Sequence, residues 1–175
     1  EEAMVTLIIP RLPSITLDDD DGTNSEPFMM ELYAYVCIDA SDRVISVASM
    51  SEFVASEDAS RVGTPAQFTS PAGRCAAAFK DFLGPYLPVW WMQQNQQYMD
   101  MLHALGMRPR LSASMVLLCA GELDVQAKAQ AASAESVPAS STALAVKDNT
   151  ESLRVKSFEL VEEFARCADE VWPQP

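Results

Sequence analysis

The sequence has few of the residues on which common catalytic motifs depend, and it contains none of those motifs. Its 175 residues include 6 glycines and one histidine, His103. There is no GxSxG elbow, no phosphate-binding glycine loop and no dinucleotide-binding fingerprint. A Cys–His pair that meets in space, between His103 and Cys75 or Cys119, is the one nucleophilic arrangement left open. We therefore predict no catalytic residues and a protein that is not an enzyme.

The cysteines are too few and too scattered to hold a metal ion. Cys37, Cys75, Cys119 and Cys167 lie about forty residues apart and form no CxxC pair, whereas zinc sites need clustered ligands. Each cysteine lies in an apolar run, which is typical of buried free thiols. We expect reduced thiols in the core, with two disulfides in a secreted protein as the alternative. We predict no metal and no cofactor.

Acidic residues are plentiful near the N-terminus, but they do not form a calcium-binding motif. If Gly22 took the sixth position of an EF-hand loop, Leu17 and Phe28 would take the first and twelfth positions, which require carboxylates. Four consecutive aspartates among turn-forming residues instead predict an exposed acidic loop over residues 10–27.

The sequence also lacks the marks of membrane-spanning and glycosylated proteins. No apolar run is long enough to cross a bilayer, no signal peptide opens the chain, and no Asn-x-Ser/Thr site occurs. The first residue is Glu1 rather than Met, as it would be after processing of a precursor. We expect no direct membrane insertion. We expect an intracellular protein, in the cytoplasm or in an organelle lumen after processing, with secretion as the alternative.

Basic residues are scarce, and the charge is unevenly distributed. The net charge is −13, with 12 Lys and Arg against 25 Asp and Glu. Residues 1–60 carry thirteen acids and two bases, residues 61–121 two acids and five bases, and residues 122–175 ten acids and five bases. Because nucleic acids are bound through Lys and Arg, we predict no nucleic-acid partner. The charge favours a basic partner protein, although negative charge also simply keeps a protein soluble.

Composition and β-branched runs predict the fold class. Hydrophobic residues make up 49% of the chain and charged residues 21%, which is ordinary for a single globular domain over residues 1–175. The pattern predicts a strand at 4–9, a hairpin of residues 28–38 with 43–50, and a buried strand within 110–121. A second hairpin is expected around Asp148 and Asn149, with a helix-starting capping box as the alternative. We therefore predict an α+β fold with an antiparallel sheet of about five to six strands in two hairpins.

Helical segments are expected to pack on this sheet. A central helical region begins after Pro71 and breaks at Pro85 and Pro88, because proline lacks an amide hydrogen. Residues 120–142 are rich in Ala and Ser and predict a thin surface helix or a mobile insertion. An amphipathic helix at 157–172 ends the chain, and the face expected to be packed carries Phe158, Val161, Ala165, Ala168 and Trp172.

The stretch from Pro85 to Leu105 combines adjacent tryptophans with amides and methionines. It predicts a helix from about Val89 that stops at Gly106. Trp90 and Met92 each lie about 100° from Trp91, so a straight helix cannot bury all three against one surface. Either the first turn packs under the proline elbow or part of it meets a partner protein. The candidate partner-binding residues are Trp90, Trp91, Met92, Gln94 and Asn95.

The expected element order over residues 28–172, β-β-α-β-β-β-α, resembles that of longin and roadblock-like domains. These are small α+β adaptors in membrane traffic and small-GTPase regulation, so the resemblance implies a trafficking adaptor. It is carried by the order of elements alone.

We predict a non-enzymatic interaction subunit or adaptor of a larger assembly, docked through the tryptophan-containing helix. Interfaces favour Trp, Tyr and Met, which that helix contains. The alternatives are a longin- or roadblock-like trafficking adaptor, a small Cys/His-dependent enzyme, and a secreted acidic binding protein.

Overall fold

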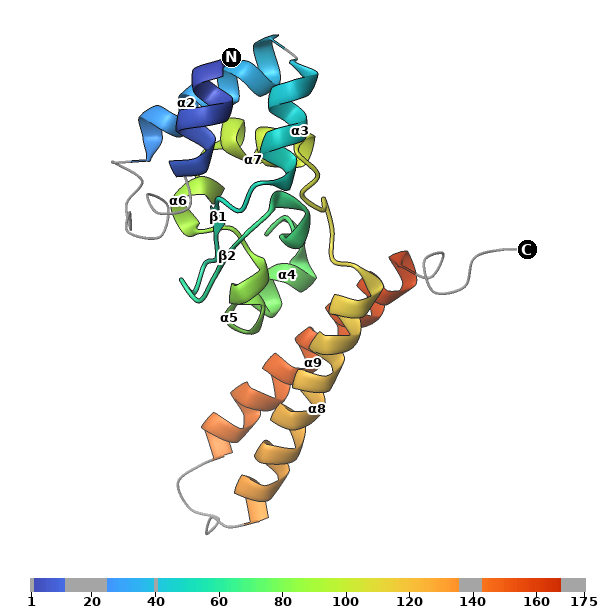
Figure 1. Ribbon diagram of the computed structural model, residues 1–175. Helices are drawn as coiled ribbons and strands as arrows, with labels where there is room; N and C mark the ends of the chain where they lie inside the picture. The colour runs from blue at the N-terminus through green and yellow to red at the C-terminus, as the bar shows by residue number, and fades with distance from the viewer. Residues whose placement is uncertain (1, 12–24, 40, 136–142, 168–175) are drawn as a thin grey trace, which may run out of the picture. The chain divides into compact units, whose positions relative to one another are not determined.

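A computed structural model describes residues 2–11, 25–39, 41–135 and 143–167 of the chain (Figure 1). It is 72% helical and contains, within those residues, one sheet of two strands. The α+β fold with a sheet of five to six strands is therefore wrong. Most of the acidic loop predicted at 10–27 lies outside the described residues, as do Ala168 and Trp172.

The chain divides into two units. The first comprises residues 1–72 and 83–110, and the second comprises residues 73–82 and 111–175. The chain therefore passes twice from the first unit to the second.

Short helices make up the N-terminal part of the first unit. They are η1 (Met4–Ile8), η2 (Ile9–Arg11), α2 (Glu26–Ala34), η3 (Tyr35–Asp39) and α3 (Asp42–Met50). Glu26 and Pro27 favour the start of α2, because an acid complements the helix dipole and proline is suited to the first turn. Met29, Leu32 and Val36 are buried at the three- and four-residue spacing of a helical face.

The strand predicted at 4–9 and the hairpin of residues 28–38 with 43–50 are consequently wrong. Both segments are rich in β-branched and aromatic residues, whose preference for strands depends strongly on packing context. In α3, Val44 and Ala48 are fully buried, one helical turn apart. Burial of residues at helical spacing therefore outweighed the β propensity of these segments.

The sheet of the first unit is short and antiparallel. It pairs β1 (Val54–Ala55) with β2 (Val62–Gly63), Val54 lying opposite Gly63 and Ala55 opposite Val62. Residues 85–89, called here the elbow, run beside β1, because Val89 N donates to Ala55 O (2.8 Å) and Glu57 N donates to Leu87 O (2.9 Å). The backbone of the elbow is thereby held against the sheet.

Arg61 also ties the sheet region to the elbow. Its Nε donates to Pro85 O (2.6 Å), and its Nη2 donates to Gln67 O (3.1 Å). The guanidinium carbon lies 5.0 Å from the centroid of the Phe68 ring and 5.1 Å from that of Tyr86. A planar cation that donates two hydrogen bonds and stacks on two rings cannot be replaced by the point charge of lysine.

The helical region expected after Pro71 is confirmed, and it breaks at the elbow. Its helices are α4 (Arg74–Ala78), α5 (Lys80–Leu83), η5 (Gly84–Tyr86), α6 (Trp90–Gln93) and α7 (Gln96–Ala104), and one further short helix, η4 (Pro65–Gln67), precedes Pro71. After α7, Gly106 has a φ of 103°, a conformation that glycine adopts without steric cost. The helix end predicted at Gly106 is confirmed, but the single helix predicted from Val89 is wrong, because the chain leaves the helix at Gln94 and Asn95 and forms two helices, α6 and α7.

The second unit is built on a helical hairpin of α8 (Ala113–Glu135) and α9 (Ala143–Arg166), with α4 also packed on α9 (Figure 1). The strand predicted within 110–121 and the hairpin predicted around residues 148 and 149 are wrong, because each lies within one of these long helices. The predicted β-β-α-β-β-β-α order is therefore wrong as well, and the resemblance to longin and roadblock-like domains depended on that order.

Candidate interaction surfaces

The adjacent tryptophans of the predicted partner-binding stretch have different environments. Trp91 is 6% exposed and Met92 is fully buried, whereas 48% of Trp90 is exposed. All three lie in α6, a single turn, so successive side chains point in different directions. Trp90 is therefore the apolar residue of this stretch that reaches the surface.

The amides of the same stretch have different roles. Asn95 is the N-cap of α7, and its Oδ1 accepts a hydrogen bond from Gln97 N (3.0 Å). The Gln93 side chain donates to Pro88 O, so it holds the first turn under the elbow. Gln94 is exposed. The N-cap role of Asn95 was missed in the sequence, although an Asn just before a periodic helix is a start signal.

The inner face of α6 and α7 is a packed core stripe. Trp91 packs edge-to-face on Tyr98, with ring centroids 6.0 Å apart. Leu102 and Leu105 continue the stripe and are also buried. Within the part of the chain that the structure describes, indole Nε1 of Trp91 and the Tyr98 hydroxyl are buried without a hydrogen-bond partner, and burial raises the pKa of Tyr98. The helical stripe expected from the sequence is confirmed as core.

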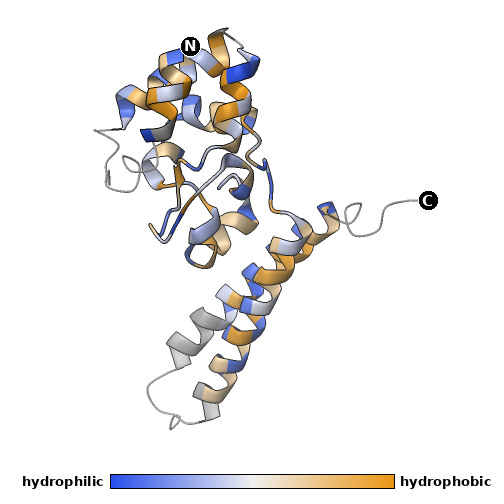
Figure 2. Cartoon of the chain, in the orientation of Figure 1, coloured by the Kyte–Doolittle hydropathy of each residue, from blue (hydrophilic) through white to orange (hydrophobic). Residues whose placement is uncertain are grey.

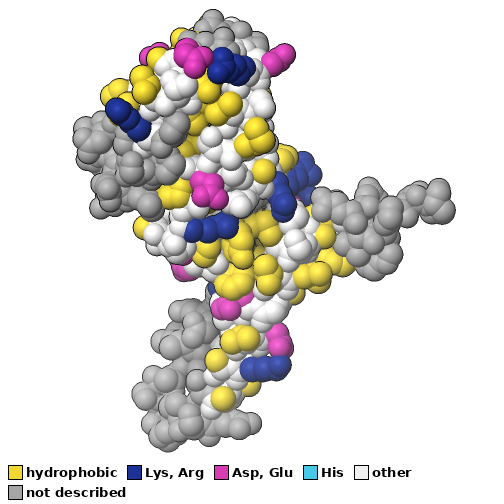
Figure 3. All heavy atoms as spheres, in the orientation of Figure 1, with side chains coloured by type: hydrophobic (Ala, Val, Ile, Leu, Met, Phe, Trp, Pro, Cys, Tyr) yellow, Lys and Arg dark blue, Asp and Glu magenta, His cyan; other side chains and the backbone are white. Residues whose placement is uncertain are grey.

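The second unit exposes a larger apolar surface on its two long helices. We call it the hairpin surface; it consists of Leu117 (59% exposed), Leu118 (47%) and Val125 (60%) on α8, and Val155 (49%), Phe158 (60%) and Val161 (67%) on α9. Figure 2 shows apolar residues along both helices, and Figure 3 shows hydrophobic side chains among charged ones on the visible face of the hairpin. Single exposed apolar residues are ordinary, but three on the same side of α9, Val155, Phe158 and Val161, are typical of an interaction surface, and Leu118 and Val125 share a side of α8 in the same way.

The exposure of α9 corrects the prediction for the C-terminal helix. Phe158, Val161 and Ala165 were expected to form the packed face, and all three are exposed. The buried residues of α9 are instead Leu160, at 9% exposure, and Glu163, at 5%. The helix has apolar residues on two sides, and within its unit the side with fewer large apolar residues is the one that is packed.

An ion pair with one buried partner, Glu163, lies on the packed side of α9. Glu163 accepts a hydrogen bond from Arg166 Nη1 (2.9 Å), while the arginine side chain is 54% exposed. Because the carboxylate is buried, its partner offsets part of the desolvation cost. This pair is explained by the fold of the hairpin.

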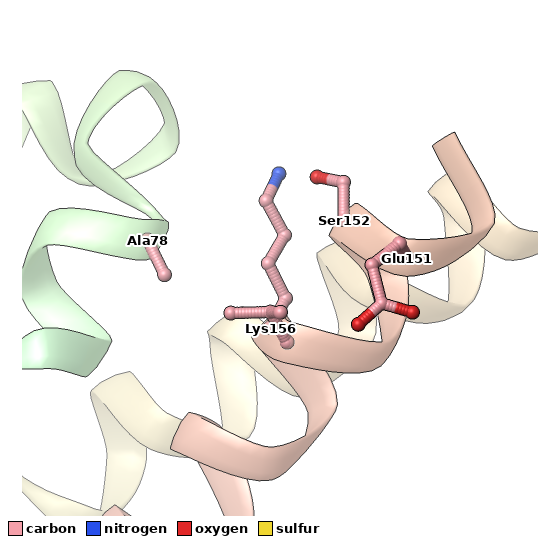
Figure 4. A pocket seen from close by; sticks show the side chains of 5 residues that line it. Ala78, Glu151, Ser152 and Lys156 are labelled. Carbon is pink, nitrogen blue, oxygen red and sulfur yellow. The ribbon is translucent and has the colours of Figure 1, made fainter. Parts of the chain in front are cut away.

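A hollow of about 440 Å³ lies between α4 and α9, and it is lined by Ala78, Glu151, Ser152, Val155 and Lys156. Figure 4 shows the Lys156 side chain between α4 and Ser152, with the Glu151 carboxylate pointing away from the lysine. Lys156 Nζ donates to Gln126 Oε1 (3.1 Å) and lies 5.6 Å from the Phe79 ring centroid. The residues lining this hollow therefore present no acid–base pair.

The thiols are poorly placed for nucleophilic chemistry. Cys75, Cys119 and Cys167 are buried and form no disulfide within the described residues, as expected, whereas Cys37 is exposed and does not lie in the core as predicted. Burial, with a smaller contribution from the charge of Glu163, raises the pKa of Cys75 to about 11. Burial likewise raises the pKa of Cys119 to about 12. A nucleophilic cysteine requires the opposite shift.

The lone histidine is part of the first unit. His103 lies in α7, and its Nδ1 is 3.4 Å from Met107 O. Its two predicted cysteine partners, Cys75 and Cys119, belong to the second unit. A Cys–His nucleophile thus gains no geometric support within either unit.

Over the described part of the chain, no three His, Cys, Asp or Glu side chains cluster as metal ligands would, and no helix has the length and hydropathy needed to span a membrane. No family model, no curated protein and no solved structure matches the chain.

Proposed function

We propose that the chain is a non-enzymatic interaction subunit that binds a partner protein through the hairpin surface. The observation that carries the proposal is the set of six large apolar side chains on α8 and α9, each 47–67% exposed. Removing apolar surface from water favours association by roughly 25 cal/mol per Å². Interfaces concentrate this gain in a few central residues, and Phe158 is the largest side chain of the set.

Trp90 supplies a second candidate contact, in the first unit. Its neighbours Trp91 and Met92 are buried, so substitution of Trp90 can be separated from an effect on the core. The net charge of −13 favours a partner whose contacting surface carries basic residues, because complementary charge speeds encounter and selects partners.

The chemistry of the thiols and of the hollow supports a binding role over an enzymatic one. The raised pKa values of Cys75 and Cys119 keep both as neutral thiols at neutral pH. Lys156 is engaged by Gln126 and the Phe79 ring. The two thiols and the Lys156 side chain therefore contribute to the packing of the second unit.

The test compares two variants of the tagged full chain in cells, followed by gentle lysis and size-exclusion chromatography with mass spectrometry. The double variant Leu118→Glu/Val125→Glu changes the α8 part of the hairpin surface. The control, Ile38→Glu, changes an apolar residue of the first unit that is 71% exposed. We expect the wild type and the control to elute in the same large complex and the hairpin variant to elute as a folded chain of about its own mass of 19.1 kDa. Elution of the wild type without any partner would contradict the proposal.

A further inference from the structure

The exposed side of α9 has a symmetric arrangement of side chains about Phe158. Val155 and Val161 lie three residues before and after it, and Arg154 and Glu162 lie four residues before and after it. At 100° per residue, all four side chains project within about 60° of Phe158. The apolar residues are thus mirrored about Phe158, and the charged residues are mirrored with opposite sign.

A second oppositely charged pair extends this arrangement towards the helix ends. Glu151 lies seven residues before Phe158, and Arg166 lies eight residues after it. Glu151 is on the same side of the helix as Phe158, and Arg166 is at the edge of that side. Four charged residues therefore surround a central apolar group of three.

From this arrangement we infer that α9 binds the α9 of a second copy of the chain, antiparallel and about a two-fold axis at Phe158. The inference rests on the proposed function, because it names the partner of the α9 part of the hairpin surface. In this register Phe158 meets its own copy, and Val155 of each chain meets Val161 of the other. Arg154 then faces Glu162 across the axis, so that each unlike-charge contact occurs twice, as a two-fold interface requires.

Charge selects this antiparallel arrangement over a parallel one. A parallel pair of α9 helices would place Arg154 against Arg154 and Glu162 against Glu162, and facing like charges are unfavourable. The antiparallel pair places unlike charges together at the same positions. At the ends, Glu151 of each chain comes near Arg166 of the other.

The ion pairs within one chain leave these residues able to take part. Arg154 Nη1 lies 3.8 Å from a Glu151 oxygen, with side chains 81% and 66% exposed. Arg166 keeps its 2.9 Å hydrogen bond from Nη1 to the buried Glu163, while its Nη2 lies 3.9 Å from a Glu162 oxygen, with side chains 54% and 40% exposed. The pairs of Arg154 with Glu151 and of Arg166 with Glu162 are loose and solvated and contribute little, so exchanging these two pairs for contacts between chains has a small cost.

The size of the contact indicates a weak dimer. α9 has 24 residues, or roughly 36 Å at 1.5 Å per residue, and one side of one helix is smaller than the usual stable interface. We therefore expect association that depends on protein concentration, with monomer predominating when the protein is dilute.

Sedimentation equilibrium of the full chain over a range of concentrations tests the inference. We expect a monomer–dimer equilibrium for the wild type. Phe158→Glu would place two carboxylates on the axis, and it should weaken dimerisation at least ~10-fold. Ile38→Glu is the control, since it changes an exposed apolar residue of the first unit, at 71%, that lies outside the hairpin surface, and it should leave the dimer intact. A wild type that stays monomeric at every concentration would overturn the inference.

Charge reversal gives the sharper test. Arg154→Glu and Glu162→Arg should each weaken self-association, by roughly 10-fold, because each creates two like-charge contacts. The double variant R154E/E162R should restore it, and an equimolar mixture of the single variants should form a mixed dimer, since every facing pair is then unlike. Single variants that dimerise like the wild type would exclude this register.

A cysteine at the axis gives an independent readout of the register. In a Cys37→Ser background, Phe158→Cys should form a disulfide-linked dimer on mild oxidation, whereas Ser157→Cys, one position around the helix, should not. Equal cross-linking of both would overturn the two-fold register.

The outcomes also separate this inference from the proposed function. If dimerisation is absent but the large complex of the full chain is lost in Leu118→Glu/Val125→Glu, the second copy is excluded and the interaction subunit stands. If the dimer forms and no other protein joins it, the second copy is the sole partner of the hairpin surface.

Discussion

The two units of this chain differ in how completely they cover their apolar residues. The first unit surrounds a continuous core that includes Phe53 and Phe68, both fully buried, together with Trp91. The second unit buries residues along one side of each long helix and leaves large apolar residues exposed on α8 and α9. The first unit also exposes large apolar side chains, but they lie on five different short helices, whereas those of the second unit lie on two long helices: the residues of the first unit are Leu7, Met30, Ile38, Met50 and Trp90.

The difference follows from the number of packing layers that each unit contains. Helices with apolar residues on two sides need neighbours on both sides. In the first unit, short helices, the β1–β2 sheet and the elbow supply these neighbours. In the second unit, α4 and α8 cover α9 in part, and Phe158 stays 60% exposed. We therefore expect the partner-binding site to include the exposed apolar side chains of α8 and α9.

The largest effect expected from this comparison comes from two phenylalanine substitutions. Phe68→Ala empties a fully buried position of the first unit and should lower the free energy of unfolding by roughly 3–5 kcal/mol. Phe158→Ala in the second unit should change it by less than about 0.5 kcal/mol, because the side chain is already 60% exposed. Urea denaturation of dilute monomer measures both values. Equal losses would mean that the second unit packs Phe158 in solution.

Arginine substitutions should show the same contrast on a smaller scale. Arg61→Ala removes two hydrogen bonds to backbone carbonyls and two ring contacts in the first unit, and should cost roughly 1–3 kcal/mol. Arg61→Lys should recover little of that stability. Arg74→Ala in the second unit removes a 3.8 Å pair with Glu159 from a side chain that is 80% exposed, so a change within about 0.5 kcal/mol is expected. Full rescue by Arg61→Lys would show that charge alone matters at position 61.

The sequence identified the features that depend on local chemistry. Proline and glycine located the break at Pro85 and Pro88 and the end of α7 at Gly106, because their effects are built into their own backbones. The helical wheel of residues 89–105 also identified the core stripe, and it required that one of Trp90, Trp91 and Met92 face away from it. That residue is Trp90.

The strands were misassigned where apolar runs are short and continuous. Within 110–121, Met115, Val116 and Cys119 are buried, a spacing that also fits a helix, and short apolar runs cannot be assigned from periodicity alone. The Ala-rich residues that follow prolong the helix to Glu135, because alanine is the best helix former. Reading the two segments as one would have given α8.

The exposed face of α9 could not be predicted from one chain. Phe158, Val161 and Ala165 form an apolar stripe, and such a stripe predicts burial without stating against what. The structure shows the opposite side of α9 packed in its unit, at Leu160 and Glu163. Which stripe is covered within the chain depends on tertiary packing, and this information is not local.

In thiol accessibility the two units differ in the opposite sense, because the accessible thiol, Cys37, belongs to the first unit. Cys37 is exposed, while Cys75, Cys119 and Cys167 of the second unit are buried. Under native conditions we expect one fast adduct, on Cys37, and three slow ones, as counted by mass spectrometry over time. A fast adduct on Cys75 or Cys119 would contradict the raised pKa values and would favour the Cys/His enzyme hypothesis.

The same shifts give the second unit a dependence on alkaline pH. The folded-state pKa of Cys75 is raised from 9.0 to about 11 and that of Cys119 from 9.0 to about 12, so the unfolded chain loses these protons first. The stabilising contribution is complete below pH 9 and is lost as pH rises from about 9 to about 12. Urea denaturation at pH 8 and pH 10.5 should show this loss, and Cys119→Ala should reduce it. If the free energy of unfolding of Cys119→Ala falls as much between pH 8 and pH 10.5 as that of the wild type, other titratable groups cause the loss of stability.

The smallest effects are expected at two glycines, with opposite signs in the two units. Gly63 in β2 leaves no room for a Cβ, which would overlap Gln67 Oε1, the acceptor of the Thr64 amide. Gly63→Ala should therefore destabilise the first unit by about 1 kcal/mol. Gly121 lies inside α8, and a Cβ there meets no atom of the described residues within 4 Å. Gly121→Ala should stabilise the monomer by roughly 0.5–1 kcal/mol through helix propensity, as read from thermal unfolding. If Gly121→Ala instead weakens the large complex, the partner approaches α8 closely at this glycine. The exposed side of α8 is then part of the docking site.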